Sequence, residues 1–382
     1  MILIRTLLSF SLLVALASPA AAQFGLLEEG AKRAKQVSDF NWSDEEKATL
    51  GAKVSTLVRQ RYGVVQDPAV HRYVALVGRT VTERSTRPGL PWTFIVLDTD
   101  AVNAFAAPHG YVHITRGALA LMRDESELAG VLAHEIVHVT EEHTIDALKK
   151  NTVKSAAAAE VTGGNALIEY LANAAYDSIL DNAYSRGDEA AADAVGITLI
   201  SKAGYAPQGL GNFLTTLAER NKNATEKRGL FSSHPEMEAR QARLTTTISK
   251  GKLAGTQLVA DRFKRTVTYK PVPQSQIATV EAGTKGLAGG SNAKGGTAND
   301  KSTSTTKAGE PAEAPKKKGF GLGKLLSGGG SETKSAQVVG SGGARGLDPE
   351  KDAKGGSNPA IVAVTITAAD LQAFKTAGSL NA

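Results

Sequence analysis

The stretch Val-Leu-Ala-His-Glu-Ile-Val-His-Val at 131–139 constrains this chain more than any other part of its sequence. His134 and His138 are four residues apart, so a helix would place both imidazoles on one face. This spacing lets two histidines bind one zinc ion, with Glu135 beside them as general base for a water molecule. The alternative is a pair of core histidines satisfied by hydrogen bonds. Because the apolar neighbours predict a buried helix, where such polar groups are costly, the sequence favours a zinc hydrolase.

The N-terminus has the pattern of a secretory signal peptide spanning residues 1–22. Arg5 precedes an apolar run at 7–17, and small residues up to Ala22 form a cleavage site. A membrane anchor is the alternative, but the run is short for a membrane span. Cleavage after Ala22 would leave residues 23–40 as an N-terminal arm.

The chain contains no cysteine. Its absence excludes a lipoprotein anchor, disulfides and zinc–thiolate sites, and leaves His, Glu and Asp as zinc ligands. Export without disulfides fits a bacterial periplasm, where stray thiols are a liability. We therefore expect a periplasmic protein that is not a lipoprotein.

Composition changes near the C-terminal third of the chain. Residues 282–358 carry twelve Lys and Arg against seven Asp and Glu, which is +5 of the net charge of +6, and hold 19 of the 39 glycines. The remainder is close to neutral, which argues against nucleic-acid binding. We expect a folded domain at 41–275 and a strand–helix element at 359–382. The linker between them, at 276–358, is expected to be disordered because it has too few large apolar residues to bury. The composition favours a solvated linker, and peripheral contact of its basic part with an anionic membrane or a partner is the alternative.

Within 41–275, helical signals outnumber strand signals. Ser43 with Glu46 forms a capping box, and Asp67 before a proline opens another helix. Residues 92–97 predict a strand, and 102–108 with 111–115 predict a hairpin. Asp124 is expected to cap the helix of the two histidines. Further helices are expected at 151–182, 185–202, 210–217 and 235–248. The fold class is α+β, mostly helical with a small sheet.

Two histidines leave a zinc site one protein ligand short. His143 is excluded, because on a continued helix it would lie roughly 140° round from His138. Glu189 and Asp193 are better placed, since they are four apart on one helix face with alanines between them. Glu189 would bind the zinc, and Asp193 would accept the free N–H of a zinc histidine. An ordinary solvated acidic patch is the alternative.

The chain resembles the HtpX-like and BepA-like zinc metallopeptidases, which are related to the CAAX prenyl endopeptidases. The resemblance covers roughly 41–250. It rests on Asn103-Ala-Phe-Ala-Ala-Pro-His-Gly-Tyr111, Thr115-Arg-Gly117, His134-Glu-Ile-Val-His138, Tyr184-Ser-Arg186 through Glu189 and Asp193, and His234-Pro235 with Arg240. It implies a zincin-type domain of the gluzincin kind, with His134, His138 and Glu189 on zinc and Glu135 as the base.

The same resemblance implies roles around the metal. The segment Asn103-Ala104-Phe105 would belong to an edge strand that lines the cleft and binds a substrate backbone by β-addition. His109, which stands where many members have glycine, would face the substrate. His234 would cover the zinc at rest or, with Arg240, stabilise the oxyanion.

Together these features predict a zinc metalloendopeptidase with one Zn²⁺ per chain. Its substrates would be unfolded or misassembled envelope proteins, which is a role in protein quality control. The alternative is a chaperone-like assembly factor for the envelope, with a latent metal site that covers itself.

Overall fold

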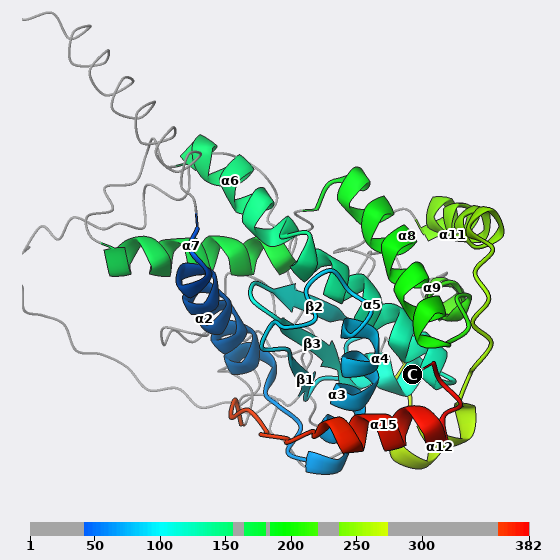
Figure 1. Cartoon of the computed structure of the whole chain (residues 1–382). Coiled ribbons are helices and arrows are strands. Elements are labelled where there is room, and N and C mark those ends of the chain that lie inside the picture. Colours follow the sequence, from blue (N-terminus) through cyan, green and yellow to red (C-terminus); the bar gives the residue numbers. More distant parts are fainter. Residues whose placement is uncertain (1–41, 156–163, 181–183, 221–236, 274–357, 382) are drawn as a thin grey trace, which may run out of the picture.

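The computed structural model describes residues 42–155, 164–180, 184–220, 237–273 and 358–381, which form helices around a small sheet (Figure 1). The helices are α2 (Asp44–Tyr62), α3 (Pro68–Thr82), α4 (Arg116–Leu121), α5 (Glu125–Thr140), α6 (His143–Ser155), α7 (Gly164–Leu180), α8 (Arg186–Ala203), α9 (Gly209–Arg220), α11 (Met237–Gly251), α12 (Ala260–Thr266) and α15 (Ala368–Ala377). The strands are β1 (Thr93–Leu97), β2 (Ala104–Ala107) and β3 (Tyr111–Thr115). The prediction of a mostly helical α+β fold is confirmed. The predicted signal peptide, arm and nearly all of the Gly-rich linker lie outside the described residues.

The three strands form one sheet in the order β1-β3-β2. β2 and β3 pair antiparallel, with Phe105 opposite His113, so the predicted hairpin is confirmed. β1 runs parallel to β3, with Ile95 opposite the same His113. β2 therefore lies at an edge of the sheet.

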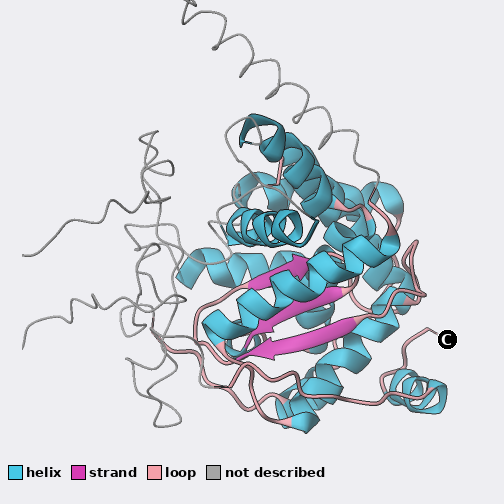
Figure 2. Ribbon diagram, turned by 90° about the vertical axis from the view of Figure 1, so that its left-hand side faces the viewer, coloured by secondary structure: helices cyan, strands magenta, loops and turns pink. Residues whose placement is uncertain are grey.

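Helices cover both faces of this sheet (Figure 2). Because side chains alternate along a strand, Val96 and Ile114 join an apolar cluster with α3 and α5, whereas Ile95 and Phe105 join a second cluster with α2 and α7. α5 lies at the centre of the fold, since it packs on β2 and β3 and also on α8 and α9. Every residue of α5 is buried.

Local sequence signals fix where several helices begin and end. Ser43 and Glu46 form the predicted capping box of α2, and Asp67 caps α3. Asp124 accepts a hydrogen bond from the Glu127 N–H at the start of α5, as predicted. α8 begins after the cap residue Ser185 and stops at Gly204, whose φ of 100° lies in the left-handed region that favours glycine.

The structure differs from the sequence prediction at several places. The chain turns after α5 and starts α6 at His143, so the helix does not continue past Thr140. The strand predicted within 359–382 does not form: residues 358–367 run beside the domain without strand pairing, and α15 follows them. The helix prediction for this element is confirmed. The short helices α4 and α12 were not predicted.

The N-terminal residues 1–41 are outside the described part of the chain. Within the part that the structure describes, no helix combines the length and the apolar composition that a membrane crossing requires.

Candidate metal centre

α5 presents His134 and His138 on one face, one turn apart. Their Nε2 atoms lie 3.1 Å from each other, and the two rings meet edge to face with centroids 4.7 Å apart. Both side chains are almost fully buried, at 3% and 1% exposed. Because α5 is enclosed on all sides, the two nitrogens point into a closed region and not into bulk water.

α8 supplies a carboxylate to the same point. Glu189 places Oε1 3.4 Å from the Nε2 of His138 and Oε2 3.6 Å from the Nε2 of His134. The two helices approach closely at Gly196, where an added Cβ would lie 3.2 Å from the backbone N of His134. The small residues of α8 therefore let its acidic face reach the histidines.

The donor set fits a tetrahedral divalent metal ion. One ligand atom from each of His134, His138 and Glu189 lies within 4.8 Å of the others. Bonds of about 2.0–2.1 Å to a tetrahedral centre would separate its ligands by about 3.3 Å, close to the contacts described above. Two imidazoles and one carboxylate leave a fourth position for water or substrate. The three residues can hold a metal ion, and this arrangement is typical of a catalytic site.

A carboxylate and a guanidinium support these ligands from behind. Asp193 Oδ1 lies 3.0 Å from the Nδ1 of His134, and Arg240 donates to both oxygens of Asp193, at 2.9 and 2.7 Å. Burial would raise the pKa of Asp193, but the hydrogen bond from His134 and the charge of Arg240 lower it to about 2. Asp193 therefore stays ionised and fixes the His134 tautomer that leaves Nε2 free to bind a metal ion.

Arg240 is 1% exposed, and its Nη1 lies 3.7 Å from Glu189 Oε2. In this structure its guanidinium holds the two carboxylates of α8. The predicted role of Arg240 in stabilising an oxyanion would need it to reach past Glu189, and it stays a prediction.

His138 is supported from its opposite side. Its Nδ1 lies 2.8 Å from the Nδ1 of His143, and the ring of Tyr184 stacks on it with centroids 4.0 Å apart. Tyr184 in turn shares a hydrogen bond of 2.8 Å with Thr144. His143 was excluded as a ligand on the premise that α5 continues. That premise is wrong, since the turn before α6 brings His143 to His138, although at Nδ1 and not at the ligand atom.

Glu135 is 1% exposed and follows His134 directly. Burial raises the pKa of Tyr184, and the charge of Glu135 adds to this effect. Burial would lower the pKa of Arg240, but nearby carboxylates, led by Asp193 and including Glu135, raise it. The Glu135 carboxylate is thus close to the same group of side chains as the metal ligands.

The predicted substrate residues lie along β2 and the turn after it. Ala104 and Phe105 are buried, and the ring of Phe105 stacks on Tyr62 in the core. Asn103 precedes the strand, and its carbonyl accepts from Thr115. Of this segment, the backbone of the edge strand is what a bound peptide could pair with.

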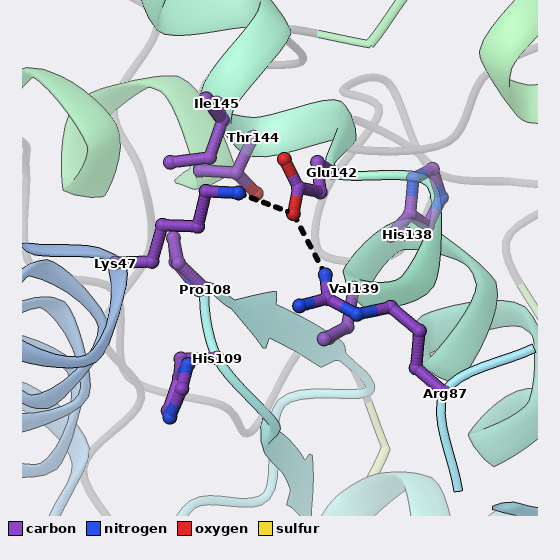
Figure 3. Close-up of a pocket in the computed structure, with 9 residues that line it drawn as sticks. All are labelled: Lys47, Arg87, Pro108, His109, His138, Val139, Glu142, Thr144 and Ile145. Atoms are coloured by element: carbon purple, nitrogen blue, oxygen red, sulfur yellow. Dashed lines mark hydrogen bonds and ion pairs between the residues drawn. The ribbon is translucent and has the colours of Figure 1, made fainter. Parts of the chain in front are cut away.

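A small pocket with a cavity volume of about 10 Å³ borders His138. His109 stands at one side of it, at a φ of 62° in the β2–β3 turn, and the α5–α6 turn lies at the other (Figure 3). The pocket is lined by Lys47, Arg87, Pro108, His109, His138, Val139, Glu142, Thr144 and Ile145.

Six of the predicted site residues therefore gather at one point. They are His134, Glu135, His138, Glu189, Asp193 and Arg240. His234 lies outside the described residues. Tyr184 stands in one of the family motifs but had no predicted role, and nothing in the local sequence marks Lys47, Arg87 or Glu142.

Comparison with known proteins agrees with this geometry. The profile of peptidase family M48 matches residues 68–248, a range that includes all six gathered residues. Over these residues the chain is similar to peptidase family M48. The recognition of a BepA-like relative from its motifs is thereby confirmed.

Individual relatives match over part of their length. The chain is 27% identical over 253 residues to the beta-barrel assembly-enhancing protease of Yersinia pestis, covering 62% of this chain and 51% of that protein. The beta-barrel assembly-enhancing protease of Escherichia coli K12 is 27% identical, over a region that covers 48% of this chain and 41% of that protein. Metalloprotease YcaL of Escherichia coli K12 is 31% identical, over a region that covers 43% of this chain and 65% of that protein. The chain thus spans about half the length of the assembly-enhancing proteases that it matches.

Proposed function

We propose that this chain is a zinc-dependent endopeptidase of the bacterial cell envelope. The observation that carries the proposal is the ligand set of His134, His138 and Glu189, whose ligand atoms lie within 4.8 Å of one another, with Glu135 adjoining it on α5. The match of residues 68–248 to peptidase family M48 supports a peptidase. Imidazole and carboxylate ligands suit zinc, and this chain has no thiolate to offer.

The residues of the site have different roles in the proposed peptide hydrolysis. A bound zinc ion would polarise the scissile carbonyl and acidify the attacking water. Glu135 takes the proton of that water and delivers it to the leaving amine. Asp193 keeps His134 in its binding tautomer, and the neighbouring His143 does the same for His138.

Substrate binding is proposed to use the open edge of β2. A peptide that adds to this strand would lie beside α5, on which β2 packs. Asn103, Ala104 and Phe105 would offer backbone groups, and His109 would contact substrate side chains. His234, with Arg240, would cover the metal at rest or stabilise the oxyanion.

The substrates we propose are unfolded or misassembled envelope polypeptides, because two of the relatives are described as beta-barrel assembly-enhancing proteases. The signal-peptide pattern at 1–22 supports a periplasmic location of the mature protein, and the basic Gly-rich linker would allow peripheral contact with a membrane.

The proposal is tested by zinc content and casein cleavage of the purified mature protein. We expect one zinc per chain in the wild type and in Glu135→Gln, and loss of zinc in Glu189→Ala. Cleavage should fall about 10²–10⁴-fold in Glu135→Gln, because the general base is removed while the ligands stay. Glu169→Ala, an exposed carboxylate on α7, is the matched control and should retain both zinc and activity.

Two results would change the assignment. Full zinc content in Glu189→Ala would show that another residue is the third ligand. A wild type that binds zinc but leaves casein intact would favour the chaperone-like alternative. In that case Glu135→Gln should still prevent aggregation of an unfolded outer-membrane protein as well as the wild type does.

A further inference from the structure

The turn between α5 and α6 has an unfavourable backbone conformation. Glu142, the residue before α6, has a φ of 57°, in the left-handed region that residues with a Cβ rarely adopt. No glycine or proline precedes it in 131–142 to end α5. Contacts from elsewhere in the fold must therefore hold this residue in place.

Two cations from distant parts of the chain bind the Glu142 carboxylate. Lys47 of α2 donates to Oε1 at 2.8 Å, and Arg87, from the loop after α3, donates to the same atom at 2.7 Å. Figure 3 shows both side chains converging on Glu142 above the pocket. The three side chains are 17%, 27% and 29% exposed, so this triplet is partly shielded from solvent and is not a simple surface pair.

The turn places the next two residues against a metal ligand. His143 contacts the Nδ1 of His138 at 2.8 Å, and Thr144 bonds Tyr184, whose ring stacks on His138. On a continuous helix, His143 would point roughly 140° away from His138. The left-handed conformation of Glu142 is therefore what brings the contacts of His143 and Thr144 to the His138 ring.

We propose that the triplet of Lys47, Glu142 and Arg87 positions His138 for metal binding, by holding the α5–α6 turn. The proposal rests on the metal centre proposed above and extends it, because it assigns a role to side chains that touch neither metal nor substrate. Glu142 is thus a positioning residue that acts through His143 and Thr144. Such supporting contacts to metal ligands typically contribute about 10–100-fold to metal affinity.

The test is the zinc dissociation constant, measured by chelator competition, in two variants of Glu142. Glu142→Ala removes the carboxylate and keeps a Cβ, whereas Glu142→Gly removes it and accepts the positive φ, so that the second variant folds without strain. Glu142→Ala should bind zinc about 10–100-fold more weakly than the wild type, and Glu142→Gly should lose less zinc affinity, because its backbone accepts the positive φ without the carboxylate contacts. The visible spectrum of the cobalt-substituted protein should also change, because it reports the arrangement of the ligands and not the stability of the fold.

The cations provide a rescue and a matched control. Lys47→Met should weaken zinc binding, and Lys47→Arg, which keeps the charge, should restore it. Lys53→Met removes another α2 lysine that pairs with an acidic residue, Glu169, away from the turn, and should bind zinc within about twofold of the wild type. In a Glu142→Gly/His143→Ala double variant, the fold-loss of zinc affinity should be smaller than the product of the two single fold-losses. The reason is that both substitutions act on His138 through the same contact.

The outcomes separate the two proposals. Wild-type zinc affinity and an unchanged cobalt spectrum in Glu142→Ala would overturn the positioning role while leaving the metal centre intact. Failure of the wild type and of Lys53→Met to bind zinc would overturn the metal centre, and the positioning role with it.

Discussion

His113 occupies the middle strand of the sheet and is 0% exposed. Its Nε2 lies 2.9 Å from the hydroxyl of Ser55 on α2. Burial lowers the pKa of His113 to about 3, because the charged ring would lose its hydration. The folded protein therefore holds this ring neutral at pH values where the unfolded chain protonates it.

This difference predicts a pH dependence of stability. As the pH falls from about 6.5 towards 3, the unfolded state takes up a proton that the folded state refuses, so the free energy of unfolding decreases by up to about 1.4 kcal/mol per pH unit. His113→Gln cannot protonate and keeps a polar group near Ser55. Urea unfolding in EDTA at pH 7.5, 6.5, 5.5 and 4.5 should show a shallower decline in His113→Gln than in the wild type. Parallel profiles would contradict the prediction.

The packing of α5 against its neighbouring helices depends on glycines at the contact points. A Cβ on Gly130 would lie 2.6 Å from the backbone N and 2.8 Å from the Cα of Leu210 in α9. Backbone atoms cannot move aside by changing a rotamer. The close approach of α5 and α9 therefore requires glycine at this position.

Gly130→Ala should accordingly destabilise the fold by about 1–3 kcal/mol, through overpacking that pushes α9 away. Gly187→Ala is the control, because Gly187 is exposed in the first turn of α8 and an added Cβ would meet nothing closer than Ser185 Oγ at 3.6 Å. It should be neutral or stabilise by up to about 1 kcal/mol, since alanine favours a helix. Urea denaturation measures both, and equal shifts in the two variants would exclude the steric explanation.

At the scale of the whole molecule, the C-terminal segment packs against residues from distant parts of the chain. Lys375 binds Glu83 at 2.9 Å, and Asp370 lies 2.8 Å from Arg72. Arg262 stacks on the ring of Phe374 and binds Glu125, the first residue of α5. α15 therefore supports α5, which carries His134 and His138, although the two helices are far apart in the sequence.

Removal of residues 358–382 should lower the free energy of unfolding by several kcal/mol. Burying each apolar side chain contributes about 1.5–3 kcal/mol, and Leu371, Phe374 and Leu380 are buried here. Phe374→Ala alone should cost about 3 kcal/mol, whereas Thr376→Ala, exposed on the same helix, should change stability by less than about 0.5 kcal/mol. Thermal unfolding of the three variants checks this. A truncated protein as stable as the wild type would refute the supporting role of α15.

The sequence by itself determined the starts of α2, α3, α5 and α8 and the two pairs of polar residues at the centre of the site. Asp124 caps α5 through a neighbour three residues away, and the four-residue spacings of His134 with His138 and of Glu189 with Asp193 put each pair on one helix face. These features depend on backbone geometry within one or two helical turns, so they can be predicted from neighbouring residues. The meeting of the α5 and α8 faces was inferred from the family resemblance and from the need for a third zinc ligand.

Only the tertiary structure decided the end of α5 and the surroundings of the site. The partners that hold Glu142 in a left-handed conformation are 95 and 55 residues away in the chain, so no local pattern reveals the turn. The contacts of Arg240 with Asp193 and of α15 with α12 likewise join residues 47 and 112 positions apart. Such contacts form only when the core brings the elements together, because their side chains have no means of meeting in an isolated segment.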